Sequence, residues 1–294
     1  MTSEILTPAV IEMLLAFENV LKQFDTDFYL VGAVARDIRL SGDPAFAAKR
    51  RTKDVDIALL IADEEKFYQV KAALLDTGNF TAHATEAVKL FYKEAIEVDL
   101  LPFGEIENEI RETRLEKPRL FVLDVPGFME IFPHAEIVQL NEHLSLKVCP
   151  LEGLVLLKLI ANDDNPSRTK DITDIEHILV VYFDICSVAI FDTDEDAADL
   201  YATDVANYIY LVSARVIGRK IAGMLATEIC CIYFRFRLVT GANFSAKLMP
   251  TLFICTWPKP MLREGIFTYG EMSMDMLLLS PVSTPRDRFM EEKR

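Results

Sequence analysis

The fold is decided by two short stretches of the chain, FYLVGAVARDIRL over residues 28–40 and DVDIALLI over residues 54–61. The first begins with four apolar residues that predict a short buried strand, and at Gly32 it passes directly into a helical pattern over residues 33–40. The second predicts another buried strand, which carries two aspartates two residues apart. Together they predict a strand, a glycine turn, a helix and a second strand.

Asp54 and Asp56 are expected on one face of the second strand, because side chains alternate in direction along a strand. Two carboxylates beside an apolar core repel each other and lose hydration, and Mg²⁺ bound through their oxygens relieves both costs. An edge strand with a solvated acidic face is the alternative. For an Asp-x-Asp pair taken alone, that alternative is the more common case.

A third strand is predicted over residues 96–102, with Asp99 at its centre. If it lies beside the strand of Asp54 and Asp56, three carboxylates hold two metal ions, the clamp used for in-line phosphoryl or nucleotidyl transfer. Asp54 and Asp56 then bridge both ions, while Asp99 holds the second ion and helps to deprotonate the nucleophile. Glu97 shares the face of Asp99 and is the lower-ranked alternative, since it lies at the strand entrance.

The turn at Gly32 and Ala33 is a candidate phosphate site, because small residues let a phosphate approach the N–H groups and positive dipole end of a helix. Arg51 and Lys53, just before the Asp-x-Asp strand, are candidates to meet the same phosphates, although a solvated loop cluster explains them equally well. Arg36 is a further candidate for nucleotide binding, and a local ion pair with the adjacent Asp37 that positions the turn is the other interpretation.

Elsewhere the patterns predict helices over residues 8–24, 63–76, 151–161, 169–183 and 195–225, a hairpin over 80–93 and a strand over 144–149. We expect an α+β protein with a mixed sheet and flanking helices in a first domain, residues 1–149, and a mainly helical second domain, residues 150–294. Residues after about 225 are apolar and aromatic without a clean period, and no structure is predicted for them.

The composition narrows the class of protein. The chain of 294 residues carries a formal net charge of −15, which disfavours a uniformly basic nucleic-acid binder, although residues 211–294 alone are net basic. Its five cysteines are scattered without a CxxC pair, so neither a disulfide framework nor a structural zinc site is expected. With no signal-peptide pattern and no apolar stretch long enough to span a bilayer, we expect a cytoplasmic protein without membrane contact.

Three motifs, LVGAVARD (residues 30–37), RTKDVD (51–56) and EVD (97–99), together resemble the DNA polymerase β-like nucleotidyltransferase superfamily. The resemblance covers roughly residues 7–105 and has the superfamily order of a glycine turn, a short helix, Asp-x-Asp and a third Asp. It implies a polymerase β-like core with two Mg²⁺ ions, or Mn²⁺ in their place, and an NTP donor. One departure is Ala33, which stands where the superfamily often has a serine that contacts phosphate, so backbone N–H groups would replace that contact.

Two subfamilies compete for the assignment. The helix motif is similar to that of CCA-adding enzymes and bacterial poly(A) polymerases, but their downstream Glu-Asp-x-x-Arg-Arg type motif is missing. The abortive-infection (AbiEii-type) toxins are the better match, because LLKLIA (residues 156–161) is followed by RTKDITD (168–174). This resemblance implies that Lys158 holds nucleotide phosphates, that Asp171 and Asp174 line the cleft, and that an antitoxin protein is a partner.

The residues themselves leave an alternative for Lys158. It is a single cation in a strongly apolar helix, and an unpaired buried ammonium is costly, so it needs an anionic partner. Asp171 and Asp174 share a helix face and are candidates for that partner, as is a nucleotide triphosphate.

The expected activity is transfer of a nucleoside monophosphate from an NTP to an acceptor hydroxyl, with release of pyrophosphate. A tRNA 3′ end, a protein side chain and a small molecule remain open as acceptors, and the net charge of −15 disfavours a large RNA. One alternative is a regulatory protein that binds a partner and retains nucleotide binding without turnover. Another is a degenerate, inactive fold, against which the presence of all three aspartates argues.

Overall fold

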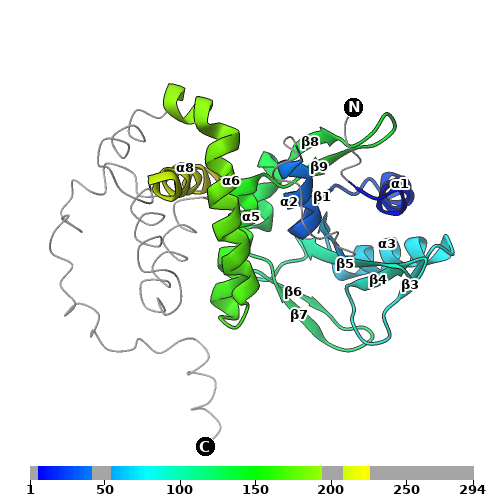
Figure 1. The fold of residues 1–294 in the computed structure, drawn as a ribbon. Helices are drawn as coiled ribbons and strands as arrows, with labels where there is room; N and C mark the ends of the chain where they lie inside the picture. Colours follow the sequence, from blue (N-terminus) through cyan, green and yellow to red (C-terminus); the bar gives the residue numbers. More distant parts are fainter. Residues whose placement is uncertain (1–5, 42–53, 194–207, 226–294) are drawn as a thin grey trace, which may run out of the picture.

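The centre of the molecule is a mixed seven-stranded sheet with the strand order β3-β4-β5-β2-β1-β9-β8 (Figure 1). The computed structural model describes residues 6–41, 54–193 and 208–225. Strand β1 pairs antiparallel with β2, while β5 pairs parallel with β2 and β9 pairs parallel with β1. The strands are β1 (Phe28–Val31), β2 (Asp54–Leu60), β3 (Phe80–Ala82), β4 (Lys89–Tyr92), β5 (Ile96–Phe103), β8 (Glu136–Gln139) and β9 (Ser145–Val148).

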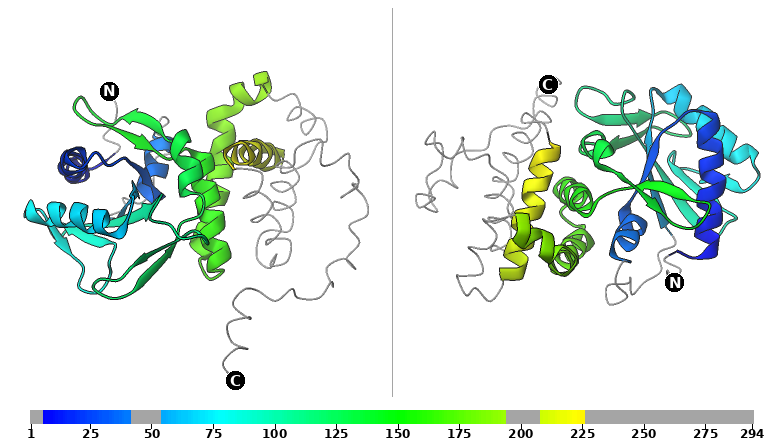
Figure 2. Two further views of the ribbon diagram at one scale, coloured as in Figure 1. Left: turned by 180° about the vertical axis from the view of Figure 1, so that it is seen from behind. Right: turned by 90° about the horizontal axis from the view of Figure 1, so that it is seen from above.

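Helices lie against this sheet and continue beyond it, so the predicted α+β class is confirmed. Helices α5, α6 and α8 lie together to one side of the sheet, as two views show (Figures 1 and 2). A two-stranded sheet of β6 (Glu112–Leu115) and β7 (Phe121–Asp124) lies outside the main sheet. The helices are α1 (Pro8–Gln23), α2 (Gly32–Leu40), α3 (Glu64–Asp76), α4 (Phe128–Ile131), the 3₁₀-helix η2 (Phe132–His134), α5 (Leu151–Asp164), α6 (Thr169–Thr193) and α8 (Tyr208–Met224).

Local signals explain where the helices begin. The hydroxyl of Thr7 accepts a hydrogen bond from the backbone N–H of Val10 at 3.3 Å, and Pro8 occupies the first helical position of α1. The carboxylate of Asp63 likewise accepts from the N–H of Lys66 at 2.7 Å and caps α3. Helix α6 runs ten residues further than predicted, because no glycine or proline interrupts the chain between its bounds.

The two faces of the sheet carry different aromatic contacts. On one face, Phe28 of β1 packs edge-on against Phe17 of α1, with ring centroids 5.3 Å apart. On the other face, Tyr29 packs against Phe132 and donates a hydrogen bond of 2.9 Å to the backbone carbonyl of Phe128. One cluster of buried apolar side chains includes residues of the sheet and of helices α1, α5, α6 and α8. The carboxylates of interest lie on the face of Tyr29, because Val31, two residues further, is the register partner of Asp56.

Several predicted segments lie outside the described residues. These are the segment that contains Arg51 and Lys53 and residues 195–207 of the helix predicted over 195–225; the residues after 225, for which no structure was predicted, also lie outside. Within the described part of the predicted helix, α8 confirms a helix at residues 208–224. Among the described helices, none is long and apolar enough to cross a membrane.

A buried charge cluster connects α5, α6 and α8. The carboxylate of Glu152 accepts hydrogen bonds of 2.6 Å from both the Tyr182 hydroxyl and the Lys220 ammonium. Burial acts to raise the pKa of Glu152, but its bonds with Lys220 and Tyr182 outweigh burial and lower that pKa. Glu152 is therefore held in its ionised form by residues from two other helices.

Replacing Lys220 with Met should destabilise the fold by about 1–3 kcal/mol, because the buried carboxylate of Glu152 loses its counterion. The double variant Glu152→Gln, Lys220→Met should recover most of that loss, since no uncompensated charge remains. Urea denaturation followed by circular dichroism measures both values. A double variant as unstable as the sum of the single changes would contradict the coupling.

Candidate active site

The turn between β1 and α2 is built on Gly32, which needs to be glycine for two reasons. Its φ angle is +65°, a conformation that residues with a Cβ atom seldom adopt. A Cβ atom at this position would also lie 1.9 Å from Oδ2 of Asp56. The turn therefore brings the start of α2 against the Asp56 carboxylate, and Ala33 follows as the second residue of the helix.

The register of the sheet brings the predicted carboxylates together. Asp56 on β2 is the register partner of Asp99 on the parallel strand β5, and Asp54 is the partner of Glu97. The strand of Asp99 therefore does lie beside the strand of Asp54 and Asp56, which is the condition for the three carboxylates to act together. Lys89 on β4 is in turn the partner of Asp99, so one row across the sheet reads Asp56, Asp99 and Lys89.

The two central carboxyl groups of this row resist ionisation. Burial is the largest cause of the raised pKa of Asp56, and the charge of Asp54 raises it further, whereas Lys158 and Arg168 act against the shift. Burial also raises the pKa of Asp99 to about 6, against the opposing effect of Lys89 and with a smaller contribution from Asp56. Each group would gain from an additional positive charge beside it.

The side chain of Asp99 shows where such a charge is missing. Its Oδ1 atom is buried and has no hydrogen-bond partner, and the Lys89 ammonium lies 4.0 Å away, too far to donate a hydrogen bond. Lys89 bonds instead to Glu97 and lies 3.7 Å from Glu86. An orphaned oxygen between acidic neighbours is consistent with a site that receives a metal cation.

The residues that would hold Mg²⁺ are Asp54, Asp56 and Asp99. Within the residues that the structure describes, there is no group of three or more His, Cys, Asp or Glu side chains close enough together to hold a metal ion without rearrangement. The three-carboxylate ligand set therefore stays a prediction. The shared row of Asp56 and Asp99, the orphaned Oδ1 atom and the raised pKa values fit it.

A second group of charges comes from the helices. The ammonium of Lys158 on α5 lies 2.6 Å from Oδ2 of Asp174 and 3.3 Å from Oδ1 of Asp171, both on α6. Both aspartates that the sequence offered as partners of Lys158 therefore contact it. Arg36 on α2 donates to Oδ1 of Asp174 at 2.7 Å and to the adjacent Asp37 at 2.9 and 3.1 Å, so the predicted local pair is confirmed.

This group lies next to the carboxylate row, because the charges of Lys158 and Arg168 act on Asp56. The predicted residues that the structure places around the Gly32 turn are thus Gly32, Ala33, Arg36, Asp56, Lys158, Asp171 and Asp174. Arg51 and Lys53, predicted to meet the triphosphate, lie outside the described residues.

Two charged residues of the site were missed in the sequence. Arg168 donates to Oδ2 of Asp171 at 2.6 Å, and its place three residues before Asp171 was the available signal. Lys89 was missed although its hairpin leads directly into the strand of Asp99. Counting back across the short connection between these two strands places Lys89 opposite Asp99.

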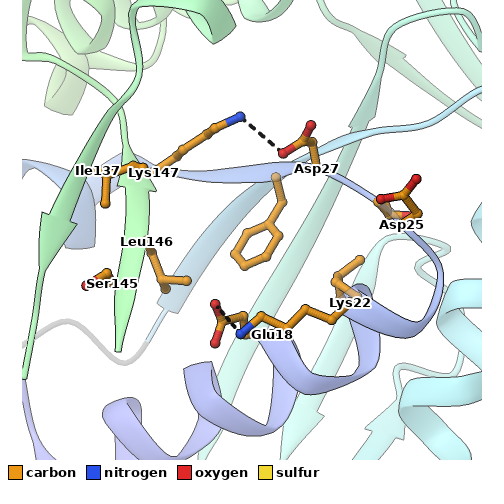
Figure 3. Close-up of a pocket in the computed structure, with 11 residues that line it drawn as sticks. Glu18, Lys22, Asp25, Asp27, Ile137, Ser145, Leu146 and Lys147 are labelled. Carbon is orange, nitrogen blue, oxygen red and sulfur yellow. Dashed lines mark hydrogen bonds and ion pairs between the residues drawn. The ribbon is translucent and has the colours of Figure 1, made fainter. Parts of the chain in front are cut away.

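A separate hollow lies at the beginning of β1, whereas the carboxylate row lies at the end of that strand. It is formed by the end of α1, the segment 25–28 and the β8–β9 hairpin (Figure 3). Its charged side chains pair with each other, Lys147 with Asp27 at 3.1 Å and Lys22 with Glu18 at 2.9 Å. It shares no residue with the site described above.

No family model matches the chain, and no curated protein matches its sequence. Solved structures resemble it at a distance. The crystal structure of ANT(2″)-Ia in complex with adenylyl-2″-tobramycin is 12% identical, with 71% of this chain and 98% of that chain covered and a TM-score of 0.38. An antigenic nucleotidyltransferase-like protein from Paracoccidioides brasiliensis is 18% identical, with 60% and 75% covered and a TM-score of 0.36.

The CCA-adding enzyme of Thermotoga maritima, complexed with tRNA, is 12% identical, with 96% of this chain and 89% of that chain covered and a TM-score of 0.26. The neighbours thus include a nucleotidyltransferase-like protein and a CCA-adding enzyme, while the AbiEii-type assignment stays a prediction. Because all three likenesses are distant, the function of this chain is argued below from its own side chains.

The raised pKa of Asp99 predicts that the free energy of unfolding decreases as the pH rises. The carboxyl has a pKa near 3.8 when unfolded and about 6 when folded, so the folded protein binds more protons in between and loses stability as the pH rises through this window. At pH 7 Asp99→Asn should therefore be more stable than the wild type by about 1–3 kcal/mol in the absence of metal. The difference should shrink toward zero near pH 4.

Urea denaturation between pH 4 and pH 7 measures this difference. Asp76→Asn is the matched control, because this aspartate at the end of α3 is exposed. A difference between Asp99→Asn and the wild type that does not change with pH would show that Asp99 has no such effect.

Proposed function

We propose that this protein is a metal-dependent nucleotidyltransferase that moves a nucleoside monophosphate from an NTP to an acceptor hydroxyl and releases pyrophosphate. The observation that carries the proposal is the row of Asp56 and Asp99 on adjacent parallel strands, placed directly against the Gly32 turn. Carboxylates in a strand row beside a helix start that carries no side chain at its first residue bring cation ligands and phosphate-binding N–H groups to one place.

The parts of the site have separate tasks in this proposal. Asp54, Asp56 and Asp99 hold Mg²⁺, which when bound neutralises the phosphates and activates the attacking hydroxyl. The backbone N–H groups at the start of α2 are the proposed phosphate donors, because Gly32 places no side chain between them and Asp56 and Ala33 contributes no hydroxyl. Asp99, whose pKa is about 6, is ionised at neutral pH and accepts the proton of the acceptor hydroxyl.

Cations for the triphosphate come from the helices. Lys158 and Arg168 act on Asp56 through their charge, and Arg36 is connected to Lys158 through Asp174. We propose a domain boundary at residues 149–150. The first domain then supplies the carboxylates and Arg36, and the second supplies Lys158 and Arg168 to the same nucleotide site. Arg51 and Lys53 stay candidates for the same phosphates.

The first experiment is a thermal-shift scan of the protein with each of the four NTPs, with and without Mg²⁺. A ligand that binds only the folded state raises the melting temperature by mass action. A Mg²⁺-dependent rise for one NTP names the donor, and labelled nucleotide then screens tRNA, protein and small-molecule acceptors. Co-purification from the native host tests for the antitoxin protein that the sequence resemblance implies.

Asp56→Asn should reduce Mg²⁺-dependent transfer by about 10³-fold or more, because a ligand that helps to stabilise several kcal/mol of developing charge is lost. The measurement is the release of labelled pyrophosphate. Asp27→Asn, which removes an aspartate from the surface pair with Lys147, is the control for folding and net charge.

Two further variants assign the third ligand. Asp99→Asn should reduce turnover more than nucleotide binding, whereas Glu97→Gln should have the smaller effect. Normal turnover in Asp56→Asn would overturn the proposed function. A larger loss in Glu97→Gln than in Asp99→Asn would move the third-ligand role to Glu97.

A further inference from the structure

The helix charges beside the carboxylate row form one continuous chain of alternating sign. Arg36 and Lys158 each contact two aspartates, and Arg168, at one end of the chain, contacts one. Three cations therefore alternate with three aspartates. The order along the chain is Asp37, Arg36, Asp174, Lys158, Asp171 and Arg168. As it stands, this set has no net positive charge to offer to a triphosphate.

The two aspartates of α6 differ in how firmly they are held. The side chain of Asp171 is only 7% exposed, and its two oxygens lie beside Lys158 and Arg168. The side chain of Asp174 is 29% exposed, and each of its oxygens receives one hydrogen bond, from Arg36 at 2.7 Å and from Lys158 at 2.6 Å. Asp174 is therefore the partner that can turn toward solvent, while Asp171 is enclosed.

The carboxylate of Asp174 also has the position of a bound anion. It bridges Arg36, in the first turns of the helix that begins at Gly32, and Lys158, whose charge acts on Asp56. Two oxygens that each accept from a different cation make the same contacts that one phosphate group would make. A carboxylate in this place satisfies both cations while no nucleotide is bound.

We propose that Asp174 is a displaceable counterion that occupies the place of a nucleotide phosphate in the free protein and gives way to it on binding. Asp171 stays in place and keeps Lys158 and Arg168 oriented, which also assigns Arg168 to the phosphate site. The proposal rests on the nucleotide site proposed above. Asp174 regulates the affinity for ligands, because Arg36 and Lys158 each lose a hydrogen bond to its carboxylate when it is displaced. Only a ligand with at least two suitably spaced anionic oxygens replaces both of these bonds.

The test compares Asp174→Asn with Asp171→Asn in calorimetric titrations with inorganic triphosphate and with the NTPs, with and without Mg²⁺. Asp174→Asn should bind inorganic triphosphate on the order of tenfold more tightly than the wild type, because two charge-assisted hydrogen bonds no longer have to be broken. Asp171→Asn should bind it more weakly, since Lys158 and Arg168 lose their anchor.

Asp27→Asn is the matched control, because it removes the same charge from a surface pair with Lys147 at the far end of β1. A gain in Asp174→Asn that Asp27→Asn shares would be a net-charge effect and would overturn the proposal, as would a gain in Asp171→Asn equal to that in Asp174→Asn. Asp174→Ser serves as a second variant if Asp174→Asn does not fold, with the same expected gain.

The outcomes separate this proposal from the proposed function. Suppose that the wild type binds NTP with Mg²⁺, that Asp56→Asn does not bind it, and that Asp174→Asn binds triphosphate no more tightly than the wild type. The counterion proposal is then wrong and the nucleotidyltransferase site stands. If Asp174→Asn gains affinity for inorganic triphosphate but no protein transfers nucleotide, the counterion proposal stands and the activity is wrong. If no protein binds either ligand, both are wrong.

Discussion

The contact between Gly32 and the carboxylate of Asp56 is the constraint on which the rest of the site depends. No side chain fits between the turn and Asp56, because even a Cβ atom would overlap Oδ2. The start of α2 can therefore approach the end of β2 only with glycine at this position, and the positive φ angle of Gly32 adds a second requirement for it. This approach aligns the helix N-terminus, the carboxylate row and Arg36, the residue through which α2 meets α6.

The second constraint is electrostatic. Asp56 and Asp99 are neighbours in a partly buried row, and burial is the largest cause of the raised pKa of each. The charge of Asp54 raises the pKa of Asp56 further, and the charge of Asp56 raises that of Asp99. The protein surrounds them with cations on two sides, Lys89 from the sheet and Lys158 and Arg168 from the helices. None of these cations donates a hydrogen bond to Oδ1 of Asp99, although the Lys89 ammonium lies 4.0 Å from it. The negative charge of the site is thus partly balanced by cations around it, while the buried Oδ1 atom of Asp99 at its centre has no hydrogen-bond donor.

Much of this arrangement was predictable from local patterns. The order of strand, glycine turn, helix and Asp-x-Asp strand follows from apolar runs and from Gly32, and the helix of Lys158 follows from its position after Pro150. The end of α6 was placed ten residues too early, because composition alone does not show where an uninterrupted helix ends. The β6–β7 hairpin and β8 were not predicted, because short strands with half-exposed faces carry a weak pattern.

The periods of strands and helices, which are readable in the sequence, place Asp54 with Asp56 and Asp171 with Asp174, and so define the groups from which the site is built. Which of these groups meet depends on how the strands and helices pack together. Strand order placed Asp99 beside Asp56 and Lys89 beside Asp99, and the packing of α2 against α5 and α6 brought Arg36 and Lys158 to the same carboxylate. Arg36 and Asp174 are 138 residues apart in the sequence, so no local pattern encodes their contact, whereas the β4–β5 hairpin that pairs Lys89 with Asp99 is local. The difference in burial between Asp171 and Asp174 likewise depends on what packs around α6, a property of the assembled core.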